Sequence, residues 1–304
     1  SISQKLKRQI KELLVSRNIM EIISWSFSNK RWEERLNLNN DILEIENPIS
    51  SELSCLRTNL VGGLLNIINK NNKKNIQNIS IFEMGPIFTG LKPGNQIEQL
   101  TIIRSGKAEE KNWASENRDF DIFDIKSDLN IILNLLKIPL NRIRIKPDKK
   151  KYYHPGKNGS VFFEDVKIAN FGEIHPSISK SFKIKNTSVL LEVYIQEIFK
   201  FINKSSFTKE KLSKSSFQSS VRDFSFEVDK KLNSIDLVNH IRNIDEEIIS
   251  EVRIFDNYEN KDFRALALEV VIQSDKKTLT EEAINRLSLE IINEAKSKFN
   301  AKLR

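Results

Sequence analysis

Histidines, cysteines and neighbouring acids are the side chains here that could do acid–base, nucleophilic or metal chemistry, and they are sparse. The three histidines, His154, His175 and His240, lie far apart in the sequence without HxxxH spacing. Cys55 is the single cysteine, whereas a structural zinc site uses about four Cys or His ligands. Pairs of neighbouring acids fall in loops or at helix edges, a pattern more typical of a solvated face than of a catalytic dyad. The sequence therefore predicts no catalytic residue and no metal site in this chain.

Motifs that bind phosphate or position a nucleophile are also missing. The chain has nine glycines, and none of them forms GxGxxG or GxxxxGK(S/T), the patterns whose backbone N–H groups cradle phosphates. Composition alone permits a Ser-His-Asp triad, but no GxSxG elbow is present to expose a serine. The sequence therefore contains no Walker-type phosphate cradle and no nucleophile elbow.

The composition is that of a globular protein. The chain has 304 residues, of which 39% are hydrophobic and 30% charged, which is typical of two domains with real cores. No run of 18 or more apolar residues occurs, so we expect no membrane span. The first residues, SISQKLKRQIKELL, lack the apolar region of a secretory signal and begin in the middle of a helical pattern. We therefore expect a part cut from a longer chain, and its single thiol fits a cytoplasmic location.

The positive charge is unevenly distributed along the chain. The formal net charge is +8, but residues 212–304 hold 15 Lys and Arg against 17 Asp and Glu, a net charge of −2. The preceding residues hold 34 against 24, a net charge of +10. Lys, Asn and Ile are abundant throughout, as in proteins from AT-rich genomes, so the basicity has a mutational explanation as well as a functional one. Any RNA contact in the C-terminal part must rest on a local patch.

The periodicity of the first part predicts a mixed α+β domain. Strands that follow one another, with helices grouped elsewhere, favour an antiparallel sheet. Asp165 and Val166 are expected to form a hairpin turn. We expect helices over residues 2–18 and 59–70 and strands over residues 78–83, 98–104, 160–172 and 187–194.

A Ser- and Lys-rich stretch over residues 203–220 interrupts this pattern and predicts a domain boundary. The alternative is a long ordered loop packed by Phe207 and Phe217, although loops of this length inside one domain are uncommon. We therefore expect domains over residues 1–204 and 212–304.

The second part has a clearer order of elements. Apolar alternation and helical spacing predict strand, helix, strand, strand, helix and strand, which is the βαββαβ order of a ferredoxin-like domain. Ser234 and Thr280 are expected to cap the two helices, and Ile235 is expected on the buried face of the first. The elements are predicted over residues 222–229, 234–244, 249–258, 264–273, 281–299 and 301–304.

The same region closely resembles a known family. RDFSFEVDKKLNSIDLVNHIRN, EVRIFDNYENKDFRALALEVVIQ, the TLTEE helix start and the final LR are similar to the ferredoxin-fold anticodon-binding domain of bacterial phenylalanyl-tRNA synthetase β subunits. Earlier in the chain, IISWSF, ENPISSELSCLRTNLVGGLL, ISIFEMGPIF, YYHPG and GEIHP resemble landmarks of that subunit's domain with a class II synthetase fold. The resemblance runs over roughly residues 10–304.

The resemblance implies a degenerate class II-like antiparallel sheet with helices, followed by the ferredoxin-like domain. No GxGxGxER motif is present to hold ATP, so the first domain should not form aminoacyl-adenylate. The resemblance implies that it packs on a catalytic α subunit, with two αβ pairs in the holoenzyme and with ATP and magnesium used there. The editing domain of the family is absent from this sequence, so editing is not expected of it either.

The resemblance also indicates where tRNA-Phe is bound. A tyrosine after the second strand of the last domain stacks on an anticodon base in this family, with an aspartate close by; these positions match Tyr258 and Asp256. An aromatic ring at a strand end is a stacking platform for an unpaired base, and a carboxylate can accept from guanine N–H groups. Cations for the RNA backbone are expected from Arg222, Arg264, Lys276 and Lys277.

Two other functions compete with this interpretation. The chain could be a small-molecule sensor, because ferredoxin-like domains can bind amino acids, and it would then bind phenylalanine or a nucleotide saturably. It could also be a freestanding RNA-binding protein, which would bind tRNA without an α subunit.

Overall fold

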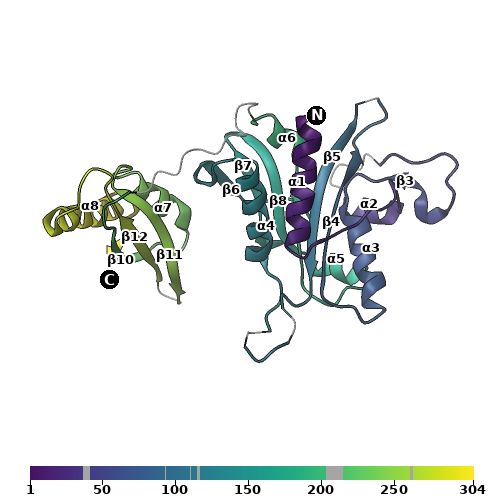
Figure 1. Cartoon of the computed structure of the whole chain (residues 1–304). Helices are drawn as coiled ribbons and strands as arrows, with labels where there is room; N and C mark the ends of the chain where they lie inside the picture. The colour runs from purple at the N-terminus through teal and green to yellow at the C-terminus, as the bar shows by residue number, and fades with distance from the viewer. Residues whose placement is uncertain (37–41, 93, 110, 115–116, 203–214, 261–262) are drawn as a thin grey trace. The chain divides into compact units, whose positions relative to one another are not determined.

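The computed structural model describes residues 1–36, 42–92, 94–109, 111–114, 117–202, 215–260 and 263–304. The chain forms two compact units, Ser1–Thr208 and Lys209–Arg304, which are described separately (Figure 1). Most of the predicted linker, including Phe207, lies outside the described residues. Within those ranges no helix is long and apolar enough to cross a membrane.

A seven-stranded sheet in the order β1-β4-β5-β9-β8-β7-β6 forms the centre of the first unit. The pair β1–β4 is parallel and the other pairs are antiparallel. The predicted antiparallel α+β class is therefore confirmed. The strands are β1 (Met20–Glu21), β4 (Ile79–Phe88), β5 (Gln96–Ser105), β6 (Ile143–Lys146), β7 (Tyr153–Phe163), β8 (Val166–Ile174) and β9 (Ser188–Val193).

Two small departures from the expected elements appear beside this sheet. The β7–β8 hairpin turns at Glu164 and Asp165, one residue earlier than predicted, because Glu164 takes the left-handed conformation with φ 54°. A separate two-stranded sheet pairs β2 (Phe27–Ser28) with β3 (Cys55–Leu56).

Helices cover both faces of the large sheet, so the central strand β9 is buried along its whole length. Its residues alternate between two cores: Val189, Leu191 and Val193 belong to one, and Leu190 belongs to the other. The first core includes residues of α1 (Ile2–Ser16), α4 (Ile122–Leu135) and α6 (Ile195–Phe199). The second includes residues of α2 (Lys30–Leu36), α3 (Val61–Asn72) and α5 (Pro176–Ser181). Two short 3-10 helices, η1 (Ser51–Leu53) and η2 (Leu140–Arg142), complete the unit.

The second unit has the predicted ferredoxin-like order, with an antiparallel sheet in the order β11-β12-β10-β13. Both helices pack on one face, because their apolar residues share a single core with those of the strands. The elements are β10 (Ser220–Val228), α7 (Ser234–Arg242), β11 (Ile249–Glu259), β12 (Arg264–Ile272), α8 (Glu281–Phe299) and β13 (Lys302–Leu303).

Details of the first helix of this unit differ from the prediction. Ile235 is 49% exposed and Leu237 is buried instead, because the buried stripe of α7 follows Leu237, Val238 and Ile241. The N-cap is Asn233, without a side-chain capping bond. By contrast Thr280 caps α8 as predicted and accepts from the backbone N–H of Ala283 at 3.3 Å.

Candidate RNA-binding face and partner surface

The sheet of the second unit has one face without helices, which we call the open face. Along β10, Phe224, Phe226 and Val228 point into the helical core. Since successive side chains of a strand alternate between faces, Asp223, Ser225 and Glu227 lie on the open face. These three side chains are exposed or half-buried. A ligand can therefore reach this face.

Tyr258 and Asp256 lie on the open face, on the edge strand β11. A β-bulge precedes Asp256, after which Asp256 pairs with Ala267 and Tyr258 with Ala265. The tyrosine ring is 52% exposed. One Asp256 carboxylate oxygen accepts from the backbone N–H of Asn257 at 2.8 Å, which holds the carboxylate close to its own strand. The exposed ring and the adjacent carboxylate suit the stacking and hydrogen bonding of an unpaired base.

The structure adds two residues that the sequence did not identify as part of this site. The ring of Phe263 lies 5.9 Å from that of Tyr258, centroid to centroid. The guanidinium carbon of Arg304 lies 4.9 Å from the centroid of Phe263. The backbone N–H of Arg304 donates to the carbonyl of Ser225 at 2.8 Å, which fixes the residue beside β10. We call Tyr258, Phe263 and Arg304 the stacking cluster.

Arg264 has a structural role in this unit. Its guanidinium donates to the side chain of Asn257 at 2.9 Å, to the carbonyl of Leu232 at 2.9 Å and to the hydroxyl of Ser234 at 2.6 Å. These bonds join β12, β11 and the start of α7. They also explain why Ser234 does not act as an N-cap, since its hydroxyl is engaged by Arg264.

The other three predicted cations lie away from the stacking cluster. Arg222 pairs with Val270, on the helical face of the sheet and five residues along β12 from Ala265, the partner of Tyr258. Five residues of a strand span about 17 Å. Lys276 and Lys277 follow β12 still further from that end. The structure therefore brings Asp256 and Tyr258 together on the open face. Arg264 lies near the same end of the sheet but is held on the helical face, and the remaining three cations lie farther away.

Lys276 already has an acidic partner. Its ammonium lies 2.6 Å from a carboxylate oxygen of Glu247, and both side chains are exposed. This hydrogen bond raises the pKa of Lys276 and lowers that of Glu247. An exposed pair of this kind is weak and opens readily.

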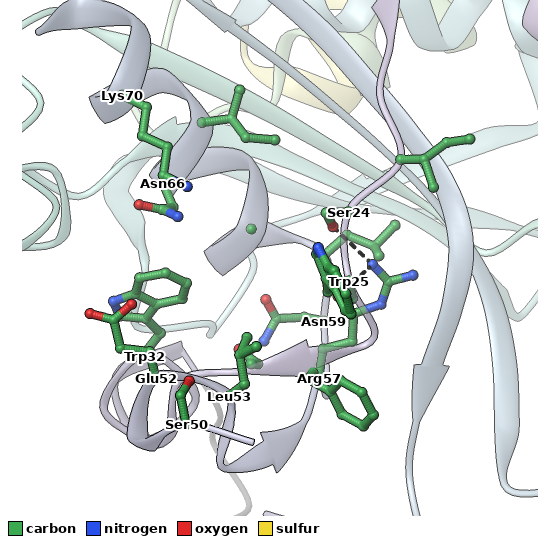
Figure 2. Close-up of a pocket in the computed structure, with 16 residues that line it drawn as sticks. Ser24, Trp25, Trp32, Ser50, Glu52, Leu53, Arg57, Asn59, Asn66 and Lys70 are labelled. Atoms are coloured by element: carbon green, nitrogen blue, oxygen red, sulfur yellow. Dashed lines mark hydrogen bonds between the residues drawn. The ribbon is translucent and has the colours of Figure 1, made fainter. Parts of the chain in front are cut away.

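The first unit has a cavity of about 390 Å³ next to α2 and α3. Figure 2 shows its lining, with Trp32 on α2 and Asn66 and Lys70 on α3. Trp25 and Arg57 come from two loops on the other side.

Buried carboxylates hold the walls of this cavity. Glu33 is fully buried and accepts from the hydroxyl of Ser28 at 2.6 Å and from the backbone N–H of Thr58 at 3.0 Å. Glu83 forms a buried ion pair with Arg57 at 2.7 Å. Buried carboxylates with several donors tie neighbouring loops together, so the cavity is preformed.

Large apolar side chains are exposed around the cavity. Ile23 is 91% exposed, Trp25 69% and Ile49 83%. The first two line the cavity, and Ile49 precedes Ser50, which also lines it. We call these three residues the apolar rim. Apolar groups exposed together mark surfaces that other proteins cover.

A buried polar cluster lies inside the large sheet, centred on Glu192 of β9. This carboxylate is 1% exposed and accepts from Tyr152 at 2.7 Å, Tyr153 at 2.9 Å and Gln99 at 3.0 Å. Lys150 forms an ion pair with it at 2.7 Å. Burial opposes ionisation of Glu192, but Lys150 and the tyrosine hydroxyls lower its pKa below the usual value. Burial and the nearby Glu192 raise the pKa of both tyrosines.

These side chains contact one another directly in the sheet. In the described part of the chain, no group of three or more His, Cys, Asp or Glu residues could hold a metal ion.

The fold is similar to that of a solved aminoacyl-tRNA synthetase. A structure of the pyrrolysyl-tRNA synthetase of Desulfitobacterium hafniense superposes with a TM-score of 0.50 at 13% identity, over 64% of this chain and 67% of that one. A second structure of this enzyme superposes with a TM-score of 0.50 at 14% identity, over 65% of this chain and 68% of that one. At such identities the likeness concerns the fold alone.

Family models assign both units. Residues 1–195 match the phenylalanyl tRNA synthetase beta chain CLM domain, and residues 215–304 match the ferredoxin-fold anticodon binding domain. The chain therefore belongs to the phenylalanyl-tRNA synthetase β chain family, which confirms the resemblance seen in the sequence.

Individual relatives agree with this assignment. The chain is 33% identical to the phenylalanine–tRNA ligase β subunit of Ehrlichia canis, over 100% of this chain and 39% of that protein. It is 30% identical to the phenylalanine–tRNA ligase β subunit of Rhodospirillum rubrum, over 93% of this chain and 36% of that protein. The chain thus spans well under half the length of the curated relatives it matches.

Proposed function

We propose that this chain is the part of a phenylalanine–tRNA ligase β subunit that binds the anticodon of tRNA-Phe and scaffolds a catalytic α subunit. The observation that carries the proposal is the stacking cluster, with Asp256 beside it, on the open face of the unit that matches the anticodon-binding domain. Exposed planar groups next to an acceptor suit unpaired bases.

The cluster holds RNA mainly by stacking. An anticodon base lies on the ring of Tyr258, and Asp256 accepts from the Watson–Crick N–H groups of a guanine. Phe263 supports the tyrosine from the side, and Arg304 supplies a planar cation close to the bases. Residues 212–304 carry a net charge of −2, which makes a general electrostatic attraction by this unit a poor alternative.

The first unit has the scaffolding role. Aminoacylation belongs to the α subunit, which uses ATP and magnesium, and this chain neither aminoacylates nor edits. Two observations support this division: no glycine-rich ATP motif occurs, and the Glu192 cluster is packed with its own side chains. The apolar rim is the surface offered to the α subunit, in a cytoplasmic holoenzyme of two αβ pairs.

The anticodon site is tested by binding of a fluorescent anticodon stem–loop of tRNA-Phe to the chain and to Tyr258→Ala. Loss of one stacked base costs about 1–3 kcal/mol, so affinity should fall by at least about five-fold, with a smaller effect on a non-cognate hairpin. Phe255→Ala is the matched control, because Phe255 is a 57% exposed aromatic residue on the same strand. Equal affinities of wild type and Tyr258→Ala would remove the proposed site.

The scaffolding role is tested by co-purification with the cognate α subunit. Trp25→Asp should abolish co-elution, because a carboxylate cannot be buried unpaired in an apolar interface. Trp113→Asp is the control, since Trp113 is 99% exposed on the same unit but outside the apolar rim. If the wild-type chain binds tRNA and never co-elutes with an α subunit, the freestanding RNA-binding function is correct instead.

A further inference from the structure

A second cavity, of about 360 Å³, lies at the end of the large sheet beside α5 and the loop that leads to β9. Its rim includes three lysines, Lys180, Lys183 and Lys185, and all three are exposed. The cavity belongs to the first unit and shares no residue with the apolar rim or with the stacking cluster.

The local sequence places these lysines on the outside. At the end of α5 the backbone N–H of Ile184 donates to the carbonyl of Ser179 at 2.9 Å. The backbone N–H of Lys183 donates to the carbonyl of Lys180 at 3.0 Å. Lys183 has a φ of +58°. This is the Schellman helix end, which reverses the chain sharply. Phe182 and Ile184 are buried in the core, so the lysines that alternate with them face solvent.

A second basic segment lies beside the first. The side-chain amide of Asn186, which lines the cavity, donates to the carbonyl of Gln77 at 3.3 Å. This contact brings the segment that follows α3 to the cavity. Lys73 and Lys74, which precede Gln77 in this segment, are exposed. We call Lys73, Lys74, Lys180, Lys183 and Lys185 the basic rim.

The charge of the basic rim is not neutralised by ion pairs among the described residues. In the described part of the chain none of its five lysines forms an ion pair, whereas Lys7, Lys11 and Lys150 of the same unit do. Among the described residues that line the cavity, Glu173 is the one acid, and it is paired with Lys157 at 2.7 Å. The surface therefore has an uncompensated positive charge around a cavity large enough for a phosphate group.

We propose that the basic rim is a second RNA contact, which binds backbone phosphates of the tRNA body independently of its anticodon. Lysine is a compact, mobile cation that suits phosphates without reading sequence. The charge distribution supports this occupant: residues 1–211 carry +10 and residues 212–304 carry −2. Electrostatic attraction of tRNA to this chain must then come from the first unit.

The test compares full-length tRNA-Phe with its isolated anticodon stem–loop as probes for the 304-residue chain over a range of salt concentrations. Each phosphate contact contributes about 0.7–0.9 to the slope of log K against log salt. Changing Lys180, Lys183 and Lys185 together to Gln should lower the slope for tRNA by about 2–3 and weaken binding at least ten-fold at low salt. Binding of the stem–loop should stay within two-fold of wild type, as an RNA without the tRNA body makes no contact there.

Two further variants separate location from net charge. Changing the same three lysines to Arg keeps the charge and should keep the slope. Changing three other exposed cations of this unit to Gln removes as much charge elsewhere and should leave most of the slope intact; suitable residues are Arg31, Arg35 and Lys92. Tryptophan fluorescence melts of every variant check that the first unit is folded.

The proposal is overturned if the Gln variant keeps the wild-type slope for tRNA, or if the control variant loses as much. In either case Tyr258→Ala, measured in the same assay, still decides the anticodon site separately. Binding of the Gln variant to anionic vesicles is measured as well. If this variant keeps its binding to tRNA but loses its binding to the vesicles, the basic rim contacts a membrane surface and the proposal is refuted.

Discussion

The Glu192 cluster allows a sharp test of how the first unit is held together. Lys150→Met removes the ammonium that lies 2.7 Å from Glu192 and keeps the aliphatic stem. Removing one partner of a buried pair costs about 3–5 kcal/mol, because the other charge stays buried. Glu192 keeps its bonds from Tyr152, Tyr153 and Gln99. We therefore expect the lower end of this range, a loss of about 3 kcal/mol.

The loss should depend on pH. In the wild type the pKa of Glu192 is lowered on folding, so its stabilisation is present above the unfolded pKa of about 4.3 and is lost as the pH falls through the folded value. In Lys150→Met, burial without the cation raises the pKa of Glu192 above the unfolded value. The variant then takes up a proton and becomes relatively more stable as the pH falls. The difference in unfolding free energy should be largest near pH 7 and shrink toward about pH 5.

Tryptophan fluorescence during urea unfolding measures this difference cleanly. All three tryptophans, Trp25, Trp32 and Trp113, lie in the first unit, so the signal follows that unit without the other. Lys149→Met is the control, since Lys149 is an exposed neighbour. If Lys150→Met matches this control, or if its effect is the same at both pH values, the ammonium is not what holds the buried carboxylate.

Three further substitutions test other parts of the structure. Gly106→Ala should destabilise the first unit by about 1–3 kcal/mol, because Gly106 has φ +88° and a Cβ there would lie 2.5 Å from a backbone oxygen. Gly94 has φ +94° with nothing within 4 Å of such a Cβ, so Gly94→Ala should lower the unfolding free energy less in the same urea titration. Glu33→Gln should cost about 1–3 kcal/mol, since an amide cannot accept from every donor around that carboxylate, and an unchanged midpoint would show that the loops do not depend on it. Arg264→Gln should lower the melting temperature of the second unit, measured by far-UV circular dichroism, and should leave the salt slope of stem–loop binding unchanged. A smaller slope with an unchanged melting temperature would show instead that Arg264 contacts phosphate.

The sequence alone determined which elements form and in what order. Amphipathic spacing and a local cap are short-range properties, so the predicted helix over residues 281–299 agrees with α8 at both ends. Alternation along β10, β11 and β12 likewise predicted the ferredoxin-like order. The family and the missing ATP motif were also readable, because both depend on residues close together in the chain.

Only the tertiary structure decided which side chains meet. Phe263 and Arg304 are distant in sequence, and the pairing of β13 with β10 brings them together beside Tyr258. Arg264 looked like a free cation, but the packing of α7 against the sheet surrounds it with three acceptors. The cluster around Glu192 arises in the same way, from segments joined by strand pairing. Such contacts depend on register and packing between distant segments, and no local pattern of residues specifies them.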